Sequence, residues 1–354
     1  MEHDIRQLLQ DLQAEAIETL DNGAFHQWSQ NEIDALHLAL ASERPLLVRG
    51  EPGTGKTQLA LAAARALGWR PERVTISPRF EALDLFYRFD AVQRLADAQA
   101  AGVAGGGVKP DHCYWLPGPF WQAFAWDDAL GYGPQAAAMK QYVGDGDEAS
   151  PARSAAGAPA STAAKPAGHV ILIDEIDKAD SDLPNSLLEV LGSREFSNPV
   201  TRQPIKPGDG LPLVVITTNE ERELPAAFLR RCVVLTLEPD DPYADFLVKR
   251  GQAHFGTAAP SARRLHETIL RTAAEQLEAD RHNARMAGVP PSGLAEYIDL
   301  LTALCRLVPG KRDEQKAWLA RLAPYAFLKN GIIDGSPQLS QKRAAVGAGE
   351  PPPQ

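Results

Sequence analysis

The chain has 354 residues, of which 44% are hydrophobic, and it carries a formal net charge of −10. This length accommodates one large domain and a smaller one. The acidic balance argues against broad binding to a phosphate backbone, which needs clustered Lys and Arg. The three cysteines, Cys113, Cys232 and Cys305, are far apart and form no C-x-x-C pair. Neither a disulfide framework nor a zinc site is therefore predicted.

Targeting and membrane signals are not evident in the sequence. The first residues, Met1-Glu2-His3-Asp4, lack the basic and apolar regions of a signal peptide. No uncharged apolar run approaches the ~20 residues that are needed to span a bilayer. We therefore expect a cytoplasmic protein with reduced cysteines and no membrane insertion.

Helical patterns and apolar runs alternate from the first residues onward. Residues 4–20 place apolar side chains at helical spacing, and residues 30–41 predict a second helix. Five short apolar runs with helical segments between them predict a parallel sheet covered on both faces. These runs are residues 45–49, 73–77, 169–174, 213–218 and 233–237. The expected fold class is α/β.

Other stretches interrupt or follow this pattern. Residues 144–168 contain no Val, Ile, Leu, Met or aromatic residue. They cannot contribute to a core, and we predict a disordered insertion. Between residues 242 and 328 the pattern is helical throughout, which predicts an all-helical region. Residues 334–354 are predicted to be a disordered tail.

The segment after the first apolar run carries the most specific motif. It reads Gly50-Glu51-Pro52-Gly53-Thr54-Gly55-Lys56-Thr57 and matches G-x-x-x-x-G-K-[ST]. Its glycines let backbone N–H groups cradle an oligophosphate, Lys56 would reach the β- and γ-phosphates, and the Thr57 hydroxyl would ligate Mg²⁺. The alternative is a chance glycine turn, which the flanking strand and helix disfavour. The predicted nucleotide contacts are Gly50, Pro52, Gly53, Thr54, Gly55, Lys56, Thr57, Gln58 and Asp174.

Two adjacent carboxylates, Asp174 and Glu175, end the third apolar run. A carboxylate at the end of such a strand can hold Mg²⁺ opposite Thr57, which is the role expected of Asp174. Glu175 follows it and is a candidate to polarise a water for attack on the γ-phosphorus. The alternative is a solvated acidic turn. That alternative is disfavoured because a buried strand precedes the pair in a chain that also carries a P-loop.

Polar residues beside the fourth and fifth apolar runs extend the candidate site. Asn219 directly follows the fourth run, and its amide can hydrogen-bond the attacking water, although Asn is also common in turns. Arg230 and Arg231 precede the fifth run, and an unpaired guanidinium is costly to bury. One of them could point across an interface at the γ-phosphate of a neighbouring subunit. The alternative is a surface pair that makes salt bridges.

Together these motifs resemble the AAA+ ATPases. Residues 50–57 match the Walker A motif, residues 171–175 match Walker B, Asn219 matches sensor 1, and residues 229–231 match the arginine-finger segment. Arg231 stands where the finger of the family precedes the strand, so it is favoured over Arg230. Within the superfamily the chain looks most like the MoxR and dynein-related group. The matching stretches are residues 115–120, 174–179, 218–220 and 224–231.

This resemblance implies a P-loop core with a five-stranded parallel sheet flanked by helices, followed by an all-helical lid. Its boundaries would be an N-terminal helical segment at 1–41, the core at 42–240, the lid at 241–333 and the tail at 334–354. Residues 80–126 would be an insertion, and residues 195–207 would form a hairpin. The relatives often carry a sensor 2 arginine early in a lid helix, but residues 290–296 offer none; Arg281 and Arg285 lie upstream.

An aromatic cluster occupies the first of these insertions. Aromatic rings can stack on single-stranded bases, but that mode also needs a positive groove, and residues 114–128 contain no Lys or Arg. Packing against the core is therefore the favoured prediction, with a protein-binding patch as the alternative. The cluster consists of Tyr114, Trp115, Phe120, Trp121, Phe124 and Trp126.

The function that the resemblance implies is a Mg²⁺-dependent ATPase that acts as a hexameric ring and remodels or activates a protein partner. MoxR-type relatives often work with proteins that bear a von Willebrand factor A domain, so such a client is expected. Two alternatives stay open. One is a nucleic-acid motor or loader, which the acidic charge disfavours. The other is a nucleotide-dependent scaffold with incidental hydrolysis, which the Asp174-Glu175 pair disfavours.

Overall fold

The computed structural model describes residues 16–18, 25–77, 80–104, 108–134, 165–179, 182–208, 210–239, 242–256, 259 and 263–327. They fall into two compact units. Among the described residues, unit 1 contains 28–49 and the stretch from 59 to 236. Unit 2 contains 16–18, 25–27, 50–58 and the residues from 237 onward. Of the disordered insertion predicted at 144–168, residues 144–164 lie outside the described residues, and so does the whole tail predicted at 334–354.

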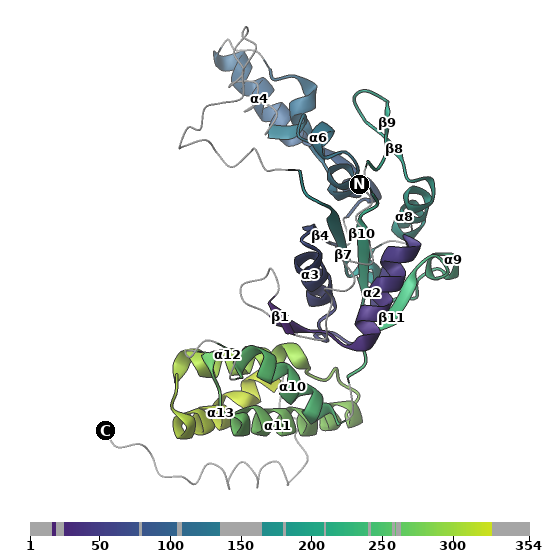
Figure 1. The fold of residues 1–354 in the computed structure, drawn as a ribbon. Helices are drawn as coiled ribbons and strands as arrows, with labels where there is room; N and C mark the ends of the chain where they lie inside the picture. Colours follow the sequence, from purple (N-terminus) through teal and green to yellow (C-terminus); the bar gives the residue numbers. More distant parts are fainter. Residues whose placement is uncertain are drawn as a thin grey trace, which may run out of the picture. The chain divides into compact units, whose positions relative to one another are not determined.

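Unit 1 is built around a five-stranded parallel sheet with the strand order β11-β3-β10-β7-β4 (Figure 1). The three inner strands are apolar and almost entirely buried, as continuous Val, Ile and Leu runs require when both faces are covered. This confirms the predicted α/β fold. The strands are β3 (Leu46–Arg49), β4 (Arg70–Thr75), β7 (His169–Asp174), β10 (Leu213–Thr218) and β11 (Val233–Thr236).

Helices connect these strands and cover the sheet. Helix α2 starts with a capping box, in which Ser29 accepts from the Glu32 amide and Glu32 accepts from the Ser29 amide. It packs beside β11 and β3 and confirms the helix predicted at 30–41. The helices that accompany the sheet are α2 (Gln30–Ser42), α3 (Lys56–Leu67), α8 (Asp182–Ser193) and α9 (Ala226–Leu229), with a 3₁₀ turn η3 (Ile176–Lys178) after β7.

A compact insertion follows β4, and its aromatic residues are part of the core of unit 1. Phe120 and Trp121 are fully buried, and Tyr114, Phe124 and Trp126 are nearly so. The predicted packing role of the cluster is thus confirmed for these five rings, whereas Trp115 is half-buried. The elements are η1 (Ala82–Leu85), β5 (Tyr87–Phe89), α4 (Ala91–Ala104), η2 (Asp111–Tyr114), β6 (Trp115–Pro117), α5 (Pro119–Phe124) and α6 (Trp126–Ala129).

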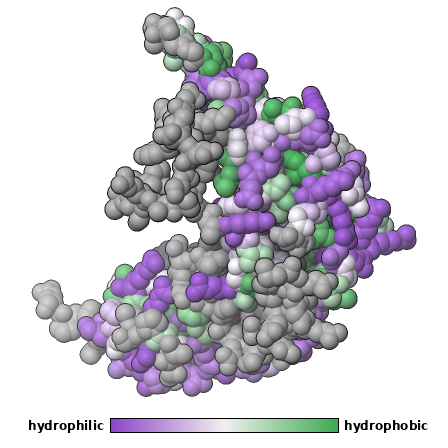
Figure 2. All heavy atoms as spheres, turned by 45° about the horizontal axis from the view of Figure 1, so that its top comes forward, coloured by the Kyte–Doolittle hydropathy of each residue, from purple (hydrophilic) through white to green (hydrophobic). Residues whose placement is uncertain are grey.

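Two further features of unit 1 agree with the sequence. An antiparallel hairpin of β8 (Phe196–Ser197) and β9 (Pro204–Ile205) occupies the position predicted before β10. Cys113 and Cys232 are buried free thiols, and so is Cys305 of unit 2, as packing cysteines should be. On the face drawn in Figure 2, hydrophilic residues and small groups of hydrophobic residues intermingle. No helix among the described residues is both long and apolar enough to cross a membrane.

Unit 2 contains a bundle of helices around its own apolar core, which includes Leu270, Leu277, Tyr297 and Leu301. This confirms the all-helical region predicted near the end of the chain, although its predicted boundary at 241–333 stays a prediction. The helices are α10 (Tyr243–Phe255), α11 (Glu267–Met286), α12 (Leu294–Leu307) and α13 (Arg312–Phe327).

The prediction of a helix over residues 4–20 is wrong for the part that the structure describes. Strand β1 (Ala16–Glu18) pairs antiparallel with β2 (Phe25–Gln27). Arg250 of α10 donates to the Gln27 carbonyl, so β2 is also tied to the helical bundle. Tertiary pairing therefore overrides a helical periodicity that was carried mostly by residues outside the described range.

Candidate active site

The carboxyl-terminal ends of β7 and β10 bring a carboxylate and a hydroxyl together. Ile173 pairs with Ile216, so Asp174 and Thr217 are the next residues on neighbouring parallel strands. The buried Thr217 hydroxyl donates to Asp174 Oδ1 at 2.6 Å and accepts from the Glu175 amide at 2.9 Å. One hydroxyl thus orients the side chain of Asp174 and the backbone of Glu175.

Asp174 has a positive neighbour as well. It is only 7% exposed, and a buried carboxylate needs compensation. The outer strand β4 supplies it, because Arg73 Nη2 lies 3.4 Å from Asp174 Oδ2. The carboxylate is therefore paired with a guanidinium on one side and oriented by a hydroxyl on the other. This donor chemistry fits a hard divalent cation such as Mg²⁺.

Glu175 has a less constrained side chain than Asp174. Its backbone has a φ of +62°, a left-handed conformation that is uncommon for a residue other than glycine. The chain reverses there and enters η3. The side chain is 31% exposed and accepts a hydrogen bond from Lys178 Nζ at 2.6 Å. The hydrogen bond with the Glu175 carboxylate raises the pKa of Lys178.

Asn219 follows β10 and is positioned through its backbone. Its amide donates to Asp177 Oδ2 at 3.1 Å, and the Glu221 amide donates to the same oxygen at 3.0 Å. Asp177 is 2% exposed and belongs to η3, so the turn after β7 fixes the turn after β10. Asn219 itself is half-buried. The structure thereby brings Asp174, Glu175 and Asn219 to the same edge of the sheet.

The predicted phosphate loop connects β3 to α3. Gly50, Gly53 and Gly55 have φ values of +147°, +78° and +96°, which L-residues rarely adopt. A Cβ at Gly50 would also lie 2.7 Å from the Leu237 carbonyl oxygen. Lys56 is the first residue of α3. Its ammonium donates to the carbonyls of Gly50 and Glu51 at 2.7 and 2.9 Å. A lysine beneath a glycine loop at a helix N-terminus fits an oligophosphate.

The same loop contacts helix α11 within unit 2. Arg281 is 5% exposed, donates to Glu51 Oε2 and to the Ser292 carbonyl, and lies 4.6 Å above the Tyr243 ring. Arg285 makes a second ion pair with Glu51 at 3.1 Å. Burial lowers the pKa of Arg281, with a smaller contribution from Arg285. The arginines that reach the loop therefore come from α11, upstream of the lid segment where the sequence lacks a sensor 2 arginine.

Comparison with known families agrees with this geometry. Residues 45–114 and 136–232 match the model of the AAA domain of the dynein-related subfamily. The chain belongs to this family and is an ATPase. No curated protein matches it at a significant level. A crystal structure of a "putative ATPase" from Cytophaga hutchinsonii is similar over 90% of this chain and 83% of the other, with 14% identity and a TM-score of 0.40.

The two candidate finger arginines of this AAA ATPase lie at the other edge of the sheet. Arg230 and Arg231 follow α9 and precede β11, whose Val233 pairs with Leu46 at the start of β3. Both are exposed, and neither has an ion-pair partner among the described residues. Strands of this length span roughly 13–20 Å at ~3.3 Å per residue. The arginines are therefore not brought together with Asp174 and Glu175.

The sequence did not predict the two residues whose hydrogen bonds hold Asp174, Glu175 and the Asn219 backbone in place. Thr217 lies in the apolar run at 213–218, and Asp177 lies in the family-like stretch at 174–179. The sequence predicts no role for either residue. Their partners are 42 to 44 residues away in the chain. The available signal was the strand alignment itself, because a polar residue at the end of a buried strand must find a partner on the adjacent strand.

Proposed function

We propose that the protein is a Mg²⁺-dependent, MoxR-type ATPase that works as a ring, with each hydrolytic site shared by two adjacent subunits. The observation that carries this proposal is the separation of the predicted catalytic groups. Asp174, Glu175 and Asn219 lie at the carboxyl ends of the strands, whereas Arg230 and Arg231 lie at the amino end of β11. An arginine at that edge can serve a nucleotide only if the nucleotide is bound to another subunit.

Each residue then has a defined task. Lys56 and the loop amides hold the phosphates of ATP, and Thr57 and Asp174 are the residues that would hold Mg²⁺. The metal ion would neutralise charge on the β- and γ-phosphate oxygens. Glu175 accepts the proton of the attacking water, and Asn219 orients that water. Lys178 Nζ lies 2.6 Å from Glu175 Oε2 and places a positive charge beside this carboxylate.

The magnitude of the arginine contribution supports the ring. An arginine finger contributes about 10³–10⁵ in kcat. A subunit that lacks the neighbour's Arg231 would be nearly idle, so assembly becomes part of catalysis. A hexamer is the assembly that the family resemblance suggests. The loop–lid contact of Glu51 with Arg281 offers a route by which nucleotide binding can alter the helical bundle.

A protein is the proposed client, acted on in the cytoplasm. A client with a von Willebrand factor A domain is proposed from the family resemblance alone. The nucleic-acid alternative is weakened because five of the six aromatic rings of the insertion are buried and cannot stack on bases. The buried free thiols are compatible with a reducing compartment.

Turnover and binding measured together test this function. Phosphate release and fluorescent-nucleotide binding are compared for the wild type, Lys56→Ala and Glu175→Gln. We expect Mg²⁺-dependent hydrolysis by the wild type, loss of nucleotide binding in Lys56→Ala, and binding without hydrolysis in Glu175→Gln. Strong stimulation by DNA or RNA would favour the motor alternative. No hydrolysis by assembled wild-type protein would favour the scaffold.

The Glu175→Gln variant also serves to identify the client. With ATP it should form a stable ring that retains its partner, and Lys56→Ala, which cannot bind nucleotide, is the matched control. Proteins from native extract that are captured by the first variant and not by the second are the candidates. A protein with a von Willebrand factor A domain among them would support the proposed client. Capture that does not depend on ATP would contradict the proposal that the ATP-bound ring holds the client.

A further inference from the structure

One arginine outside the predicted motifs makes several contacts with the finger segment. Arg44, in the connection between α2 and β3, donates from Nε to the Arg231 carbonyl at 3.1 Å. Its Nη2 donates to the Arg230 carbonyl and, at 3.3 Å, to the Cys232 carbonyl. A single guanidinium therefore binds three consecutive carbonyls that are 186 to 188 residues away in the chain.

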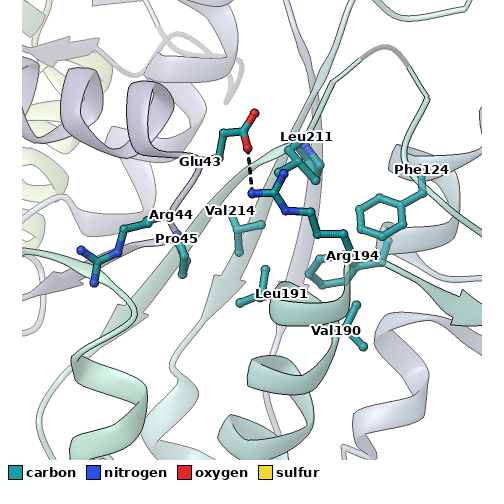
Figure 3. Close-up of a pocket in the computed structure, with 11 residues that line it drawn as sticks. Glu43, Arg44, Pro45, Phe124, Val190, Leu191, Arg194, Leu211 and Val214 are labelled. Atoms are coloured by element: carbon teal, nitrogen blue, oxygen red, sulfur yellow. Dashed lines mark ion pairs between the residues drawn. The ribbon is translucent and has the colours of Figure 1, made fainter.

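The end of α2 explains why Arg44 points there. Glu43 adopts a left-handed conformation, and the Arg44 amide donates back to the Ala39 carbonyl at 3.1 Å. The Pro45 carbonyl then accepts from the Val233 amide at 2.8 Å and opens the β3–β11 ladder. Figure 3 shows the Arg44 guanidinium directed away from the Glu43–Arg194 ion pair beside it. The Arg44 guanidinium therefore contacts the finger segment and not the neighbouring ion pair.

The chemistry of this contact suits a guanidinium. The three carbonyls lie in the turn between α9 and β11, beyond the last helical residue, and backbone carbonyls outside helices and strand ladders need donors from side chains or water. The planar fork of arginine can bind several carbonyls in a fixed geometry, which a lysine ammonium cannot do. Cys232 supplies no competing charge, because burial raises the pKa of its thiol to about 12. The contact fixes the backbone of Arg230 and Arg231 and leaves their side chains exposed.

We propose that Arg44 is a positioning residue for the arginine finger, so that it acts on the hydrolytic site of the neighbouring subunit and not on its own. This inference rests on the proposed function, in which Arg231 serves the nucleotide of another subunit. A purely structural role would lower the stability of the subunit that carries the substitution. A positioning role has a different signature, because the loss appears at the neighbour's site.

Mixing experiments separate the two roles. In Arg44→Ala we expect kcat to fall by about 10²-fold, the effect that a small misplacement of a catalytic group can have. Nucleotide affinity and KM should stay unchanged. An excess of Glu175→Gln subunits, which cannot hydrolyse ATP but present an intact finger, should restore turnover at the Arg44→Ala sites. Arg231→Ala is the reference and should be restored in the same way.

Matched variants keep the test decisive. Arg44→Lys retains the charge without the fork, so it provides a folded protein if Arg44→Ala is unstable, and it should show the same restoration. Arg194→Ala removes another arginine at the same edge and should have wild-type turnover. The inference is overturned if Arg44→Ala has wild-type turnover, or if Arg231→Ala is restored and the Arg44 variants are not. If neither is restored, the shared site of the proposed function fails as well.

Discussion

The two edges of the parallel sheet hold their functional groups in different ways. At the carboxyl edge, Asp174 and Glu175 are tied to neighbouring strands and turns by hydroxyl and ionic contacts within one subunit. At the amino edge, the backbone of Arg230 and Arg231 is fixed by Arg44 while both guanidiniums are exposed. In the proposed function, the first edge carries out chemistry in its own subunit, and the second presents an arginine to the nucleotide of the neighbouring subunit.

The largest expected effect comes from the amino edge. Arg231→Ala should reduce kcat by about 10³–10⁵ in the assembled protein, because it removes the charge that we propose stabilises the transition state. ATP affinity should be nearly unchanged, since the phosphate loop is intact. Steady-state phosphate release and nucleotide titration measure the two quantities.

Arg230→Ala is the natural control for that change. The same carbonyl contacts to Arg44 hold both residues, so the two variants should fold equally well. A small effect of Arg231→Ala together with a large effect of Arg230→Ala would reassign the finger. Small effects of both would show that the amino edge has no part in hydrolysis.

The carboxyl edge should give the next largest effect. Glu175→Gln removes the proposed general base and should lower kcat by about 10²–10⁴ while ATP still binds. Glu189→Gln changes an exposed glutamate of α8 in the same unit and should behave as wild type. Single-turnover hydrolysis with radiolabelled ATP distinguishes a slow chemical step from slow product release. A Glu175→Gln variant with wild-type single-turnover rates would remove Glu175 from the mechanism.

The sequence predicted the carboxyl edge better than the amino edge, and the reason is physical. β7 and β10 coincide with the predicted runs at 169–174 and 213–218, since inner strands of a covered parallel sheet must be apolar throughout. The acidic and amide residues that end them are visible as motifs. Arg44 carries no such signal, because its contacts depend on a turn geometry and on partners far away in the chain.

The outer strands were harder to predict than the inner ones. β4 was expected at 73–77 but spans Arg70–Thr75, because an edge strand tolerates charged residues such as Arg70 and Glu72. Arg73, which lies in both the predicted and the observed strand, compensates Asp174. This contact was not predicted because it depends on the pairing of β4 with β7, about 100 residues apart in the chain, which no local motif signals.

A smaller effect should follow from the hydroxyl that organises the carboxyl edge. Thr217→Val removes a buried hydrogen bond to Asp174 and leaves the Glu175 amide without its acceptor. We expect a loss of about 2 kcal/mol in the free energy of unfolding, since one of the two bonds involves a charged group. Denaturant titration measures it. Thr217→Ser, which keeps the hydroxyl, should recover most of the loss, and failure to do so would assign the effect to packing.

The smallest effect is expected from the ion pair at the amino edge that does not touch the finger. Figure 3 shows the ion pair between Arg194 and Glu43. Arg194 Nη2 lies 2.8 Å from Glu43 Oε2, and about half of each side chain is exposed. Arg194→Ala should change the free energy of unfolding by less than about 1 kcal/mol and leave turnover unaltered. Thermal unfolding and phosphate release provide the check. A large loss of turnover would mean that the whole amino edge, and not the Arg44 contact alone, supports the finger.

The most direct test of the shared site is complementation between the two edges. Glu175→Gln and Arg231→Ala are each expected to be nearly inactive alone. The two proteins are mixed in equal amounts and allowed to assemble. If every site uses Glu175 of one subunit and Arg231 of the next, random mixing should regenerate about a quarter of the sites. ATPase activity should then rise far above that of either variant. Activity that stays at the sum of the two separate variants would contradict the account.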